Sequence, residues 1–194
     1  RCAALQGRDR DICPSQASQR LLRGSPCEVE SFVHTIGVGS AGLGELRIAA
    51  STAAERLGTM VRETLAKGRF PVCIGGDHSI TSGYVQALAD RHEDFGVLQL
   101  DAHADLRDSY EGSPLSHACV MARIREITPH TLQIGIRSLS AEEARLAKDR
   151  RLSLCTMHRF RKNGFDLDAA LQRLPRHLFI TVDVDVFDWS VIAS

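Results

Sequence analysis

Three potential metal ligands follow a short apolar segment in the middle of the chain. Val97–Leu100 is mostly apolar and follows Gly96, which predicts a buried strand, and Asp101, His103 and Asp105 come directly after it. On an extended backbone, residues two apart point to the same side, so these three side chains would converge. Buried carboxylates need a compensating cation. A solvated turn with this pattern by chance explains the same residues, and the motif alone does not decide between the two.

Two other predicted strands also end in ionisable residues. His78 follows the apolar segment Phe70–Ile74 through a Gly-Gly-Asp turn, and Asp183 and Asp185 follow the apolar segment Leu178–Val182. A role for His78 as a helix cap is the alternative. Ligands of parallel sheets bind outside the carboxyl ends of the strands, so we expect all six ionisable side chains to meet there.

Four carboxylates and two imidazoles make a donor set rich in oxygen. Such a set favours Mn²⁺ or a similar hard ion over a zinc site built on thiolates, and six ligands suit two ions that share carboxylates. A site with two metal ions activates water, which predicts a hydrolase. His117, in the loop after Asp105, is a candidate for proton transfer, and capping of a helix start is the alternative role.

Predicted strands and helices alternate along the chain, which indicates one α/β domain over residues 1–194 with a mostly parallel sheet sandwiched by helices. The predicted strands are Ser31–Val38, Phe70–Ile74, Val97–Leu100, Thr131–Ile136, Leu152–Thr156 and His177–Val186. The predicted helices are Pro14–Arg23, one from a Thr52/Glu55 capping box to Gly68, one from Ser79 to about Arg91, Ser116–Ile127, one capped by Ser140 and Glu143, and Asp166–Leu174. The glycines from Gly37 to Gly44 predict a plain connecting loop.

The composition argues against several classes of partner. Lys plus Arg and Asp plus Glu are 24 each, and no basic stripe predicts a nucleic-acid partner. No apolar run approaches the roughly 18 residues of a membrane span, and no signal peptide is visible. The six cysteines have no C-x-x-C spacing, which indicates reduced thiols and a cytoplasmic protein.

Three segments, in order, resemble the signatures of the ureohydrolase (arginase and agmatinase) family. They are Gly75–Ser79, Asp101–Asp105 and Asp183–Asp188, and the similarity covers roughly residue 30 to the end. The loop Leu106–Met121 resembles the agmatinase branch, since arginases carry a different, Asn-containing loop there. The resemblance implies an arginase-like three-layer α/β/α fold and a homo-oligomer, usually a trimer or hexamer.

The resemblance also implies a role for each candidate residue. One Mn²⁺ would be held by His78, Asp101, Asp105 and Asp183, and a second by His103, Asp101, Asp183 and Asp185, with Asp101 and Asp183 bridging. The hydroxide between the ions would attack the guanidinium carbon of agmatine, giving putrescine and urea for polyamine biosynthesis. Asp105 would pass a proton to the leaving amine, and His117 would shuttle protons near the mouth.

Three features depart from the family pattern. Trp189 replaces the usual Pro after the third motif, and the chain stops at Ser194, before a Thr-Gly-Thr-Pro-Glu-Pro-Gly-Gly segment whose Glu pairs with the substrate guanidinium. The first family strand is also missing before Arg1. We therefore expect a piece truncated at both ends that binds metal weakly and turns over poorly by itself.

Several alternatives share part of the pattern. Arginine or guanidinobutyrate as substrate would leave the ligands unchanged. A single-zinc deacetylase shares the fold but does not need His78 together with Asp183 and Asp185, and a metallophosphoesterase needs a G-N-H-D/E motif that the sequence lacks. Outside the enzymes, a non-catalytic member or fragment that assembles with intact subunits is the alternative, which a natural end at Ser194 would support.

Overall fold

A parallel sheet of four strands forms the centre of the described structure. This computed structural model describes residues 43–75, 77–188 and 190. The strands are β1 (Gly96–Leu100), β2 (Thr131–Ile136), β3 (Ser153–Thr156) and β4 (Leu178–Val182), and they pair in the order β3-β2-β1-β4. Each neighbouring pair is parallel, which confirms the predicted class of sheet.

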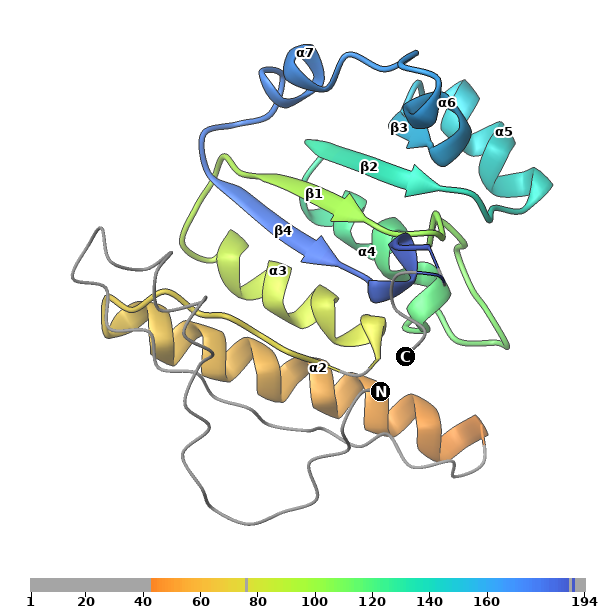
Figure 1. Cartoon of the computed structure of the whole chain (residues 1–194). Coiled ribbons are helices and arrows are strands. Elements are labelled where there is room, and N and C mark those ends of the chain that lie inside the picture. The colour runs from red at the N-terminus through yellow and green to blue at the C-terminus, as the bar shows by residue number, and fades with distance from the viewer. Residues whose placement is uncertain (1–42, 76, 189, 191–194) are drawn as a thin grey trace.

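Helices cover both faces of the sheet (Figure 1). They are α2 (Leu43–Ala66), α3 (Thr81–Ala89), α4 (Val120–Ile127), α5 (Ala141–Asp149), α6 (Met157–Arg161) and α7 (Leu167–Leu171), with 3-10 turns η1 (His78–Ile80), η2 (His117–Cys119) and η3 (Val184–Val186). One face packs on α3 and α4, with α2 outside α3, and the other face packs on α7. No described helix is long and apolar enough to span a membrane.

The central strand β1 is buried on both faces, because its residues alternate between two apolar clusters. Val97 packs with Val85 of α3 and Met121 of α4, whereas Leu98 packs with Leu132 of β2 and against Leu171 of α7. A strand buried in this way is nearly continuous in apolar residues, which is why the sequence marks it clearly. The carboxyl end of β1 is therefore held firmly from both sides.

The segment Phe70–Ile74 is not the buried strand that its apolar pattern predicts. It has no strand pairing, and Phe70 and Ile74 are 66% and 67% exposed. Only β1 pairs with β4 among the described strands, and Ile180 of β4 is 52% exposed. Phe70–Ile74 and β4 line one groove of about 770 Å³. An apolar pattern becomes a strand only where a neighbour supplies hydrogen bonds, and no described strand pairs with Phe70–Ile74.

Several element boundaries differ from the prediction. α2 begins at Leu43, so Thr52 does not cap it and Gly44 of the predicted loop is helical. Ala49 and Ala50 have high helix propensity, which explains the earlier start. β4 ends at Val182, and the chain then turns into η3, because the Asp183 side chain accepts a hydrogen bond from the Asp185 N–H.

Smaller differences concern the other helices. The predicted helix Ser116–Ile127 is the turn η2 followed by α4, and Asp166–Leu174 shortens to α7. α6 was not predicted, and it begins where the Thr156 side chain accepts a hydrogen bond from the Arg159 N–H. The predicted helix Pro14–Arg23 and strand Ser31–Val38 lie outside the described residues.

The close packing of α2 on α3 predicts an effect of Gly83→Ala. A Cβ atom at Gly83 would overlap the carbonyl oxygen of Ala54, so α2 and α3 would have to separate. Overpacking of this kind costs about 1–3 kcal/mol, whereas the same exchange in an uncrowded helix gains about 1 kcal/mol. Gly83→Ala should therefore lower the free energy of unfolding measured in urea.

Gln86→Ala is the matched control, because Gln86 is exposed on the same helix. It should change the free energy of unfolding by less than about 0.5 kcal/mol. A Gly83→Ala protein as stable as the wild type would show that the two helices can separate without cost.

Candidate metal centre

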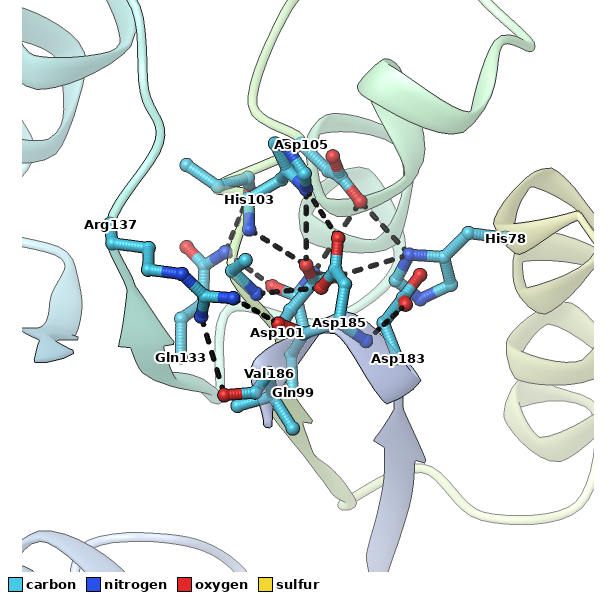
Figure 2. Close-up of polar contacts among 12 residues, drawn as sticks. His78, Gln99, Asp101, His103, Asp105, Gln133, Arg137, Asp183, Asp185 and Val186 are labelled. Atoms are coloured by element: carbon cyan, nitrogen blue, oxygen red, sulfur yellow. Dashed lines mark hydrogen bonds and ion pairs between the residues drawn. The ribbon is translucent and has the colours of Figure 1, made fainter. Parts of the chain in front are cut away.

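The six predicted ligands lie around one cavity at the carboxyl ends of the strands (Figure 2). His78 begins η1, and Asp183 and Asp185 lie on the turn after β4. The other three follow β1: Asp101, His103 and Asp105. The cavity has a volume of about 600 Å³. Residues separated by about a hundred positions in sequence thus meet because parallel strands end at the same edge.

The ligand atoms form two groups with one shared member. Those of His78, Asp101 and Asp183 lie within 4.8 Å of one another, and so do those of Asp101, His103 and Asp185. Asp105 adjoins the first group, since its Oδ2 is 2.9 Å from His78 Nδ1. The arrangement can accommodate two metal ions that share the Asp101 carboxylate.

The backbone after β1 is not extended, contrary to the prediction. Asp105 has φ of 50°, a left-handed conformation that Asp adopts more readily than most residues. Its carbonyl oxygen accepts hydrogen bonds from the N–H groups of Met121 and Ala122, which ties the loop to the start of α4. The three side chains therefore converge through this turn, with Asp101 and Asp105 buried and His103 exposed.

His78 is held by two carboxylates. Its Nδ1 is 2.9 Å from Asp105 Oδ2 and 3.2 Å from Asp101 Oδ2. Burial by itself would lower the pKa of His78, but the hydrogen bonds to Asp101 and Asp105 outweigh it and raise the pKa to about 10. Without a metal ion, His78 is therefore a cation that neutralises part of the carboxylate charge.

The surroundings shift the pKa values of the carboxylates in different directions. Burial alone would raise the pKa of Asp101, but hydrogen bonds from His78 and from the His103 N–H hold that pKa below its usual range. Burial raises the pKa of both Asp105 and Asp185. Asp101, the residue shared by both groups, is thus the carboxylate that most favours the charged form among these three.

The donor set fits divalent metal ions. Asp101, Asp105 and Asp185 all pair with imidazoles, those of His78 and His103. A neutral imidazole nitrogen can bind a metal ion. A metal cation can therefore take the place of the proton on His78 between the imidazole and the carboxylates. Carboxylate oxygens with imidazole nitrogens are the ligands of Mn²⁺ and similar ions.

His117 lies on the wall of the same cavity. It begins η2, and its ring lies 5.7 Å from that of Tyr110 in an edge-on arrangement. The Arg107 guanidinium lies over the ring of Tyr110, 4.9 Å from the ring centre. The loop after Asp105 therefore supplies a base, an aromatic ring and a cation to the cavity.

Several residues that support the ligands were not predicted from the sequence. Gln99, Gln133 and Thr181 lie inside strands that are otherwise mainly apolar, and Arg137 follows β2. Polar residues at single positions in buried strands were the available signal, because a buried polar group requires a partner.

The sequence is similar to known proteins over most of its length. Residues 15–194 match the sequence model of the arginase family. N(1)-aminopropylagmatine ureohydrolase of Thermus thermophilus is 36% identical over 145 residues, which are 73% of this chain and 50% of that protein. Agmatinase of Bacillus anthracis is 33% identical over 146 residues, which are 70% of this chain and 48% of that protein. The chain therefore spans about half the length of these relatives.

A solved structure also shares the fold. Agmatine ureohydrolase of Thermoplasma volcanium has a TM-score of 0.66 and 30% sequence identity, covering 84% of this chain and 58% of that chain. This similarity confirms the predicted arginase-like three-layer α/β/α fold.

The charge on His78 predicts a pH dependence of the metal-free protein. The pKa of His78 is about 10 in the folded state against 6.5 ordinarily, so its pairing stabilises the fold fully below pH 6.5. This contribution should be lost as the pH rises from 6.5 to about 10. Urea unfolding at several pH values after chelation measures it.

The variant His78→Asn isolates this effect, because it removes only the imidazole. Its free energy of unfolding should fall less steeply than that of the wild type over the same pH interval. Parallel curves for the two proteins would contradict a protonated His78 in the folded state.

Proposed function

The chain belongs to the arginase family, and we propose that the protein is a ureohydrolase with two Mn²⁺ ions that hydrolyses the guanidino group of agmatine. The observation that carries the proposal is the pair of ligand groups joined by Asp101 in a single cavity. Water adds to the guanidino carbon, the bond from this carbon to the alkylated nitrogen breaks, and a proton passes to that nitrogen. The products are urea and putrescine.

We assign the ligands as two overlapping sets. His78, Asp101, Asp105 and Asp183 would hold one ion, and Asp101, His103, Asp183 and Asp185 would hold the other. The proximity of the ligand atoms supports the first set and, in the second, Asp101, His103 and Asp185. The place of Asp183 in the second set rests on the resemblance of its motif to that of the family. When bound, two such ions lower the pKa of water and stabilise the charge that develops on the substrate.

Two side chains move protons in this scheme. Asp105 Oδ2, which lies beside His78 in the cavity, delivers the proton to the leaving amine. His117 exchanges protons between the cavity and solvent, since it lines the same cavity but belongs to neither ligand group.

N(1)-aminopropylagmatine is the second candidate substrate. Proteins named for it are among the relatives, as are proteins named agmatinase. The two substrates share the guanidino end and differ only at the far end of the chain, so the same metal centre serves either one. The loop from Arg107 to His117, with Tyr110, faces the cavity and is the segment that distinguishes them.

Urea release by the full protein after Mn²⁺ loading tests the proposal. We expect urea from agmatine, and parallel assays contain N(1)-aminopropylagmatine, arginine and guanidinobutyrate. If urea is released only from one of the other three compounds, that compound replaces agmatine as the proposed substrate. No urea from any of them, with Mn²⁺ bound, would favour a non-catalytic family member.

His117→Asn should reduce kcat about 100-fold or more and leave Mn²⁺ affinity unchanged, because His117 moves protons without binding the metal in this scheme. Steady-state kinetics and metal titration measure the two effects. His130→Asn is the control, since His130 lies just before β2 at the opposite edge of the sheet. Equal kcat values for His117→Asn and the wild type would remove His117 from the mechanism.

A further inference from the structure

Three polar side chains form a row across the sheet beneath the ligand cluster. Gln99 of β1 is paired in register with Gln133 of β2 on one side and with Thr181 of β4 on the other. Gln99 and Gln133 are 0% and 1% exposed, and Thr181 is also buried. Gln99 lies two residues after Val97, on the face that packs against α3 and α4. Buried amides at this position are costly unless their hydrogen bonds are made.

Hydrogen bonds from this row reach the ligands directly (Figure 2). Gln99 Nε2 donates to Asp101 Oδ2 at 2.7 Å and lies 3.5 Å from Asp105 Oδ2. Gln133 Nε2 donates to Gln99 Oε1 at 2.5 Å and to the carbonyl oxygen of Ala104 at 2.6 Å. Thr181 Oγ1 lies 3.1 Å from Nε2 of His78, the imidazole edge that faces away from the carboxylates.

The donors and acceptors of these hydrogen bonds can be assigned in only one consistent way. An ionised carboxylate only accepts, so Gln99 must present its NH₂ group to Asp101 and its oxygen to Gln133. Gln133 must then present its NH₂ group, whose second hydrogen meets the Ala104 carbonyl. Gln133 therefore prevents the Gln99 amide from rotating by half a turn.

The carboxylate of Asp101 is held at both oxygens. Oδ2 accepts from Gln99, and Oδ1 accepts from the His103 N–H at 2.7 Å. Oδ2 lies 3.2 Å from His78 Nδ1, and Oδ1 lies 3.7 Å from His103 Nδ1. Each oxygen thus faces the imidazole of a different ligand group. A carboxylate oxygen that accepts one hydrogen bond keeps a second lone pair for another partner.

We propose that Gln99, oriented by Gln133, is the positioning residue that turns the two oxygens of Asp101 toward the two ligand groups and thereby sets the affinity of the metal pair. This inference rests on the proposed function, in which both groups bind Mn²⁺. Gln99 belongs to neither ligand group and does not line the cavity. A neutral amide suits this role, because it holds the carboxylate without adding a cation that would compete with the metal.

Gln99→Met tests the inference, because methionine has a similar length but donates no hydrogen bond. We expect Mn²⁺ affinity, measured by calorimetry on the chelated full protein, to fall by about 10- to 100-fold, the usual range for a residue that supports a metal ligand. The electron paramagnetic resonance signal of the coupled manganese pair should weaken in parallel, since Asp101 would no longer be held between the two groups.

Thr128→Val is the matched control for a merely structural effect. Thr128 is also buried and polar, but its Oγ1 donates to the carbonyl oxygen of Phe95 at the opposite end of the sheet. Thr128→Val should lower the stability of the metal-free protein and leave Mn²⁺ affinity unchanged. A Gln99→Met protein that binds Mn²⁺ as tightly as Thr128→Val would overturn the inference.

Gln133→Met provides a second test in which the amide beside Asp101 remains. It should also weaken Mn²⁺ binding, and the double variant with Gln99→Met should bind like Gln99→Met alone if Gln133 acts through Gln99. Additive losses would show that Gln133 acts through its hydrogen bond to the Ala104 carbonyl instead, and would overturn its role in orienting Gln99. Gln133→Met carries the test if Gln99→Met does not fold.

Metal titration and urea release distinguish this inference from the proposed function. Weakened Mn²⁺ binding in Gln99→Met, without urea from the wild type, would support the positioning role and overturn the ureohydrolase proposal. Unchanged Mn²⁺ binding in Gln99→Met, with urea from the wild type, would overturn the positioning role and support the ureohydrolase proposal. A wild type that binds no Mn²⁺ would overturn both.

Discussion

The accumulation of negative charge at one edge of the sheet is the constraint on which the rest of the structure depends. Asp101, Asp105, Asp183 and Asp185 line the same cavity, and burial works against the charged form of several of them. His78 relieves this charge as long as it keeps its proton, which explains the high pKa of its imidazole. The same imidazole must lose that proton to bind a metal ion, so protons and metal ions compete for one position.

Local hydrogen bonds shape each loop that carries ligands. The side chains of Asp77, Asp101 and Asp183 each accept from the backbone N–H two residues later, at 2.9, 2.7 and 3.1 Å. This turn is characteristic of Asp, and it bends the chain at the end of a strand or before a helix. In such a turn one carboxylate oxygen is fixed by the residue's own loop, which reduces the reorganisation that binding requires.

Contacts from β2 then fix the turn after β4, although β1 lies between these strands. Arg137 donates to the carbonyl oxygens of Val186 and Phe187, each at 3.3 Å, and also to that of Asp185. Gly135 has φ of 99°, and a Cβ atom there would lie 2.6 Å from Cγ2 of Val186. The turn that carries Asp185 thus packs closely on the end of β2 and depends on a glycine there.

The sequence by itself determined the candidate ligands and the class of fold, because acidic and imidazole side chains after buried apolar segments such as Val97–Leu100 carry a strong local signal. It misled at Phe70–Ile74, since an apolar pattern does not reveal whether a neighbouring strand is there to pair with. Only the tertiary structure decided that Gln99, Gln133 and Thr181 lie in one row, because register between strands distant in sequence depends on packing of the whole sheet. The same holds for the orientation of Asp101, which depends on a donor from its own strand that another strand holds in place.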